Sequence, residues 1–271
     1  QKYGSSVLAN ILYSNRINRS IESSFDYVVG RDFDEIIKEA WQKYQQIYSK
    51  ERELFPDIPE SSRIPFKNKY HAEITQVEYH PSGEFLAFVD NEKGKWKIRY
   101  YYPGEKKPDK VIKKGQVNPF QITDTNYPMI QWGREVDALY IIYEKRDVIY
   151  LQVIDLEGNE IYKQPIAPNI NRIYDFDVLS EFELILSANI SGFSDLVKYE
   201  INTRQTPRIN ADFYDDISVT YGMWLGKKGV FFSSNRNGRQ PGNYRRDTIV
   251  PTGTFDIYFL PEDQWDEDNP Q

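Results

Sequence analysis

Apolar residues in the first 50 positions recur at three- and four-residue steps, the spacing of one face of a helix. Asp32 and Glu35 have the spacing of a capping box. The apolar stripe that follows comprises Phe33, Ile36, Ile37, Ala40, Trp41, Tyr44, Ile47 and Tyr48. Ser20 can cap a shorter helix that ends at Gly30, and a further apolar set lies within residues 5–14. We predict a helical segment over residues 1–50 with three helices. Their apolar faces must pack on each other, on the β-domain or on a domain that is missing from this chain.

The pattern changes after residue 50. Residues 51–70 carry Pro56, Pro59 and Pro65 among charged residues, which predicts a linker. From residue 71 onward, short apolar stretches alternate with turn residues, which is typical of β-strands. The last ten residues, 262–271, read as an acidic tail.

A strand–turn–strand unit recurs four times in residues 71–261. The units are EYHPSGEFLAF (78–88), QWGREVDALYI (131–141), DVLSEFELIL (177–186) and MWLGKKGVFF (223–232). Their anchors Leu86, Leu139, Leu184 and Val230 are 53, 45 and 46 residues apart. Third strands follow at 97–102, 148–155, 195–201 and 255–260, and outer strands at 111–115, 160–166 and 206–210. Four strands per unit of this length predict β-propeller blades. A β-sandwich would explain the alternation but does not require the unit to recur.

The repeats resemble TolB-type, WD-repeat-like propeller repeats. The last repeat carries the resemblance best, through FFSSNRNG (231–238) and DIY (256–258), and the first through PSG (81–83) and LAF (86–88). In the second and third repeats, Gly133-Arg134 and Leu179-Ser180 stand in place of the Pro-Ser turn. The resemblance implies a mainly β fold, a β-propeller preceded by an α-helical segment.

Residues 3–44 resemble the last helices of a gluzincin-type metallopeptidase domain, which can precede a TolB-like propeller in large Gram-negative envelope proteins. The resemblance implies that the chain is a fragment of a longer protein. His71 and His80 are the only histidines, and neither lies in an H-E-x-x-H helix. We therefore expect no peptidase activity in this chain.

Composition narrows the classes of function. A net charge of −7 and a pI of about 5.1 argue against a nucleic-acid partner. The absence of cysteine excludes disulfides and cysteine metal sites. No apolar run approaches the length of a transmembrane segment.

Motifs for catalysis or cofactor binding are missing. There is no G-x-S-x-G, P-loop or dinucleotide motif, and His71 and His80 do not have the spacing of a metal pair. The turn at 155–159 offers oxygen ligands for calcium but also reads as an ordinary turn. No acidic pair, Asp215-Asp216 included, stands out as a glycosidase pair. We expect no metal, no cofactor and no catalytic residue.

Charged stretches are the best candidates for binding. Residues 93–114 carry nine lysines and arginines, and residues 261–271 carry five acids and no base. Each stretch can simply be a solvated surface, or it can dock a charged partner. An insertion at 236–254 has the residue mix of interface hot spots, and we predict that it contacts a partner through Arg236, Arg239, Tyr244, Arg245 and Arg246.

These patterns predict a non-catalytic protein-interaction module of a bacterial envelope complex, located in the periplasm and associated with the outer membrane. Its partners would be envelope proteins. An accessory domain of a larger metallopeptidase and a carbohydrate-binding or hydrolytic propeller are the alternatives. Because only four repeats are visible, we also expect an incomplete propeller, with a closed four-bladed ring as the competing arrangement.

Overall fold

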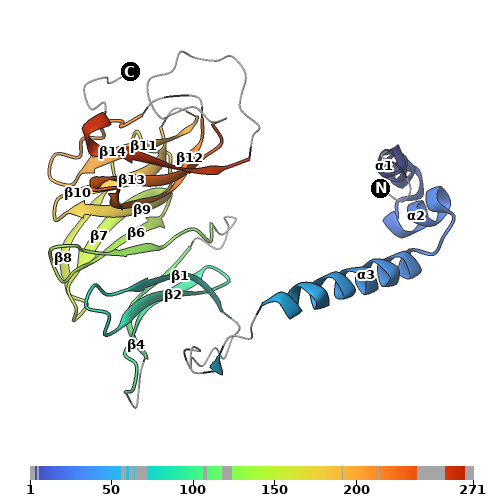
Figure 1. Cartoon of the computed structure of the whole chain (residues 1–271), viewed down its shortest axis with the longest axis horizontal. Coiled ribbons are helices and arrows are strands. Elements are labelled where there is room, and N and C mark those ends of the chain that lie inside the picture. The colour runs from blue at the N-terminus through green and yellow to red at the C-terminus, as the bar shows by residue number, and fades with distance from the viewer. Residues whose placement is uncertain are drawn as a thin grey trace. The chain divides into compact units, whose positions relative to one another are not determined.

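The computed structural model describes most of the chain: residues 4, 6–55, 59–60, 64, 72–105, 109–117, 124–190, 192–210, 212, 214–236 and 254–265. The chain divides into two compact units, Gln1–Pro65 and Phe66–Gln271. The first unit is helical and the second is built from β-sheets (Figure 1).

The helices of the first unit are α1 (Ser6–Asn18), α2 (Ile21–Val29) and α3 (Phe33–Leu54). The Ser20 hydroxyl accepts a hydrogen bond from the third N–H of α2, and Gly30 ends that helix in the left-handed region at φ 71°. Asp32 caps α3 by accepting from the Glu35 N–H at 3.1 Å. The three predicted helices are confirmed, and α3 continues to Leu54, into the segment predicted as a linker.

The apolar stripe of α3 is exposed to solvent. Trp41 is 67 % exposed, and Ile37, Tyr44 and Tyr48 are each more than half exposed. None of the described helices combines the length and the apolar character needed to cross a membrane.

The described residues of the second unit form four antiparallel sheets, each with its strands in chain order. The first sheet holds β1 (Glu73–Tyr79), β2 (Leu86–Glu92), β3 (Lys95–Tyr101) and β4 (Asp109–Gln116). The second holds β5 (Met129–Trp132), β6 (Leu139–Lys145), β7 (Val148–Ile154) and β8 (Glu160–Pro165). The third holds β9 (Arg172–Ser180), β10 (Glu183–Asn189) and β11 (Ser194–Glu200). The fourth holds β12 (Asp216–Trp224), β13 (Lys227–Ser234) and β14 (Asp256–Pro261), and a 3-10 turn, η2 (Glu262–Gln264), follows it.

The predicted anchors Leu86, Leu139, Leu184 and Val230 all lie in the second strand of their sheet and are buried. One predicted outer strand is wrong. Residues 206–210 form no regular strand, although they lie along β11 through the bridge between Val197 and Arg208 and two backbone hydrogen bonds, from Lys198 N–H to the Pro207 carbonyl at 3.0 Å and from Ile209 N–H to the Leu196 carbonyl at 2.8 Å. Pro207 contributes to this difference, because it has no N–H to donate to a ladder.

Neighbouring sheets pack face to face through hydrophobic clusters. Ile98 and Ile141 belong to the cluster between the first and second sheets, and further clusters join the second to the third and the third to the fourth. Among the described residues, no cluster joins the first sheet to the fourth. Figure 1 shows these two sheets at opposite ends of the series. The four sheets are therefore propeller blades in an open arc rather than a closed ring.

Both ends of the arc present apolar side chains. On the fourth sheet, the Phe259 ring lies 4.8 Å from Phe231 and 5.4 Å from Trp224, and Ile257 is 80 % exposed. On the first sheet, Val77 and Tyr79 are about half exposed or more, whereas Leu86, Phe88 and Tyr101, which the register places on the same face, form a buried cluster. In the interior of the arc, the corresponding faces are covered by the next sheet.

Candidate functional site

The predicted partner-binding insertion falls between β13 and β14, which are paired strands of the fourth sheet. Of its five predicted binding residues, the structure describes one, Arg236. The others, Arg239, Tyr244, Arg245 and Arg246, lie outside the described residues, and their role stays a prediction.

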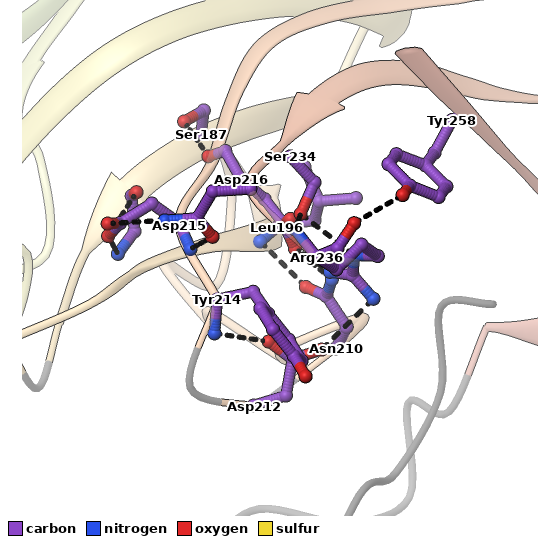
Figure 2. Close-up of polar contacts among 12 residues, drawn as sticks. Ser187, Leu196, Asn210, Asp212, Tyr214, Asp215, Asp216, Ser234, Arg236 and Tyr258 are labelled. Carbon is purple, nitrogen blue, oxygen red and sulfur yellow. Dashed lines mark hydrogen bonds and ion pairs between the residues drawn. The ribbon is translucent and has the colours of Figure 1, made fainter. Parts of the chain in front are cut away.

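Arg236 is completely buried (Figure 2). Its Nη2 donates to both carboxylate oxygens of Asp216, at 2.7 and 2.6 Å, and its Nε donates to the Ser234 hydroxyl at 2.8 Å. Its Nη1 lies 3.1 Å from a carboxylate oxygen of Asp212. A guanidinium engaged in this way by carboxylates of its own chain is not available to a partner.

The network around Arg236 ties the third and fourth sheets together. The Ser187 hydroxyl, on β10, donates to the backbone carbonyl of Asp216 at 2.6 Å. Asn210 accepts from the Leu196 N–H of β11 at 2.9 Å, and its amide donates to the Asp216 carboxylate. We therefore assign Arg236 a structural role.

The acids of this network have perturbed pKa values. Burial raises the pKa of Asp216 to about 6, against the lowering effect of Arg236. Burial also raises the pKa of Asp212. The pKa of nearby Asp195 is raised to about 8, again chiefly by burial, although Arg208 lies 3.4 Å away. Sequence reasoning noted Asp215-Asp216 as an acidic pair and Arg236 as a surface residue, and it missed that they meet.

An apolar pocket of about 240 Å³ opens between the second and third sheets. Its apolar walls include Val136, Tyr140, Ile161, Tyr162, Phe182 and Ile201. The Tyr140 hydroxyl donates to the Glu181 carbonyl at 2.9 Å, and the Tyr162 hydroxyl donates to the Ile201 carbonyl at 3.1 Å. These bonds fix the two rings and leave their apolar faces to line the pocket.

The rim of the apolar pocket is exposed and acidic. Ile161 is 62 % exposed and Phe182 is 48 % exposed. Asp137 and Glu181 line the pocket, and none of its described lining residues is basic. Burial raises the pKa of Tyr140 to about 12, and the charges of Glu181 and Glu135 add to the rise. The pocket thus combines an apolar interior with a negative edge.

A second group of acids lies on the innermost strands. Burial, followed by the charges of Asp177 and Asp175, raises the pKa of Glu78 to about 7, and burial raises that of Asp175 to about 6. Asp177 accepts from Arg134 Nη2 and from the Tyr221 N–H, both at 2.7 Å. Carboxyl groups with raised pKa values can act in acid–base chemistry, and structural networks also produce them.

The residues weighed as metal ligands are engaged in local contacts. His80 Nδ1 lies 2.9 Å from the Ser82 hydroxyl, and its ring stacks on Phe85. Asp155 accepts from the backbone and the side chain of Asn159, as in an ordinary turn. Within the described part of the chain, no three His, Cys, Asp or Glu residues are grouped to hold a metal ion. His71 lies outside that part.

Comparison with known proteins identifies the fold. No family model matches the chain, and no curated protein matches it. The structure of TolB from Acinetobacter baumannii is 12 % identical, with a TM-score of 0.50, over 70 % of this chain and 44 % of that one. A putative TolB from Agrobacterium tumefaciens is 12 % identical with a TM-score of 0.42, covering 68 % and 64 % of the two chains. A puromycin hydrolase is 9 % identical with a TM-score of 0.48, covering 73 % and 28 %.

The chain thus spans less than half the length of the Acinetobacter TolB. At this identity the likeness concerns the fold. Together with the four packed sheets, it defines the class of the second unit as a β-propeller of TolB-like fold.

Proposed function

We propose that the chain is a non-catalytic β-propeller module that binds protein partners in a bacterial envelope, in the periplasm and associated with the outer membrane. The apolar pocket between the second and third sheets carries the proposal of protein binding. The placement in the envelope is supported by the resemblance of residues 80–102 and 229–260 to TolB-type repeats.

The apolar pocket matches a short segment of a partner protein. A cavity of about 240 Å³ has room for one large aromatic or branched side chain. Such an anchor in a desolvated pocket typically dominates the binding free energy. The carboxylates of Asp137 and Glu181 at the rim favour a lysine or arginine beside the anchor.

A peptide library displayed on phage and selected on the full chain tests this proposal. We expect selected peptides to combine a large apolar residue with a neighbouring basic residue. Phe182→Ala should weaken their binding about tenfold or more. Phe255→Ala is the matched control, because Phe255 is exposed to nearly the same degree, 46 % against 48 %. Equal binding by the Phe182 variant and the wild type would contradict the proposal.

Two observations favour the alternatives. The exposed apolar stripe of α3 is a surface that a further domain could cover, as expected of an accessory part of a larger metallopeptidase. The raised pKa of Glu78 among the inner-strand acids is the feature expected of a hydrolytic propeller. Turnover of a peptide or glycoside by the purified chain that Glu78→Gln abolishes would replace the non-catalytic proposal.

A further inference from the structure

A second cavity, of about 290 Å³, lies between the first and second sheets and is lined by lysines. Lys113 and Lys114 reach it from β4, Lys145 from the end of β6, and Lys163 from β8. We call it the lysine pocket. The first two belong to the basic stretch 93–114, whereas the other two come from a different blade, so that only the fold brings the four together.

The wall of the lysine pocket is aromatic and rigid. Trp96 and Tyr143 are buried, with ring centroids 5.9 Å apart, and Tyr143 stacks on Tyr150. Trp96 lies against the backbone of β4 at Gly115, where a Cβ atom would come within 2.1 Å of the indole ring. Glycine at this position is therefore required for the ring to lie across the strand.

Lys113 is held at this wall. Its ammonium group lies 5.1 Å from the centre of the Tyr143 ring and hydrogen-bonds the side-chain oxygen of Gln152. Burial lowers the pKa of Lys113, and the charges of Lys163 and Lys145 lower it further. The lysines therefore repel one another in the unliganded protein.

Acidic groups offset only part of this charge. Glu160 accepts from Gln152 at 2.7 Å, lies 4.0 Å from Lys163, and acts to raise the pKa of Lys113. Glu144 also lines the lysine pocket, but the charges that act most on it are those of Asp147, Asp124 and Arg172. The four lysines are thus offset by at most two carboxylates, those of Glu160 and Glu144. The lysine pocket is therefore a positive region in a chain whose net charge is −7.

We propose that the lysine pocket is a binding site for a phosphate group, either as inorganic phosphate or as a phosphomonoester. Lysine ammonium groups bind phosphate as compact point charges that donate in several directions, whereas the planar fork of an arginine binds phosphate and carboxylate in a fixed bidentate geometry. No arginine is among the described residues that line the pocket. Several ammonium groups around one cavity suit a tetrahedral dianion, which accepts hydrogen bonds in several directions.

Equilibrium binding to the full chain tests the proposal, with inorganic phosphate, glycerol phosphate and vesicles of phosphatidic acid in phosphatidylcholine as separate probes. Isothermal calorimetry and the intrinsic tryptophan fluorescence, to which Trp96 in the pocket wall contributes, are the readouts. We expect phosphate or glycerol phosphate to bind, and the double variant Lys113→Gln with Lys163→Gln to weaken binding about tenfold or more. Binding to the vesicles alone would assign the phosphate to a lipid headgroup.

The matched control is Lys110→Gln with Lys228→Gln, which makes the same change of net charge at two exposed positions outside the pocket. It should bind like the wild type. Lys163→Gln alone changes a side chain at the surface of β8 and should weaken binding without unfolding, as checked by circular dichroism. Equal losses in the pocket and control variants, or no binding of any phosphate probe by the wild type, would overturn the proposal.

Discussion

Arg236→Met should destabilise the chain far more than a surface arginine substitution. The change leaves Asp216, which is completely buried, and Asp212 without their cationic partner. Removing one member of a buried ion pair typically costs about 3–5 kcal/mol. A domain of ordinary stability has only about 5–15 kcal/mol in total, so this loss should be evident in urea unfolding monitored by circular dichroism.

The loss should depend on pH in a defined direction. In the folded protein the pKa of Asp216 is about 6, above its ordinary value of 3.8. An acid with a raised pKa destabilises the fold when it is ionised, so this cost is absent below about pH 3.8 and complete above about pH 6. Arg236 limits the rise, and its removal raises the pKa of Asp216 further. The destabilisation by Arg236→Met should therefore be small near pH 4 and grow toward pH 8.

Two variants make this prediction decisive. Asp216→Asn combined with Arg236→Met should cost less than the sum of the single changes, because the uncompensated charge is gone. Arg172→Met is the control, since Arg172 is about half exposed and its ion pair with Asp124 at 2.9 Å should contribute about 1 kcal/mol or less. A loss at Arg236 no larger than that at Arg172, or one that does not vary with pH, would refute the reasoning.

Three further predictions follow from single residues. Gly115→Ala should destabilise the chain by about 1–3 kcal/mol, because its Cβ would overlap the Trp96 ring, and equal urea midpoints would contradict this. Asp195→Asn should become more favourable relative to wild type as pH rises from about 4 to 8, because ionising a carboxyl with a pKa of about 8 costs stability over that range; a flat difference in unfolding free energy would count against it. The exposed apolar end of the arc predicts self-association in sedimentation velocity, and Ile257→Ser, at a side chain that is 80 % exposed there, should reduce it without lowering stability; a monomeric wild type, or unchanged association of the variant, would contradict this.

The repeated units were predictable from the sequence because alternation and turn residues are local signals. Leu139 and Leu184, for example, mark second strands by their place after a turn, and Ser20 and Asp32 mark helix starts by capping chemistry. That residues 206–210 form no regular strand was harder to predict. Pro207 weakens strand pairing in this segment, but the segment keeps the apolar pattern of a strand.

Contacts between blades could not be predicted from the same signals. Arg236 belongs to a basic stretch by sequence, yet it meets Asp216 because β12 and β13 pair at Asp216 and Ser234, two residues before Arg236. Lys113 and Lys163 are 50 positions apart and meet only through the packing of the first sheet on the second. Such sites depend on the register and twist of whole sheets, which one sequence does not reveal.

A crystal structure of the chain would test most directly the claim that its four sheets are consecutive blades of an open arc. The account predicts that β1–β4 and β12–β14 make no contact with each other and that the apolar faces carrying Val77 and Phe259 are each free or covered by another copy of the chain. A closed four-bladed ring, with the face of the fourth sheet that carries Phe259 packed on the first sheet, would contradict it.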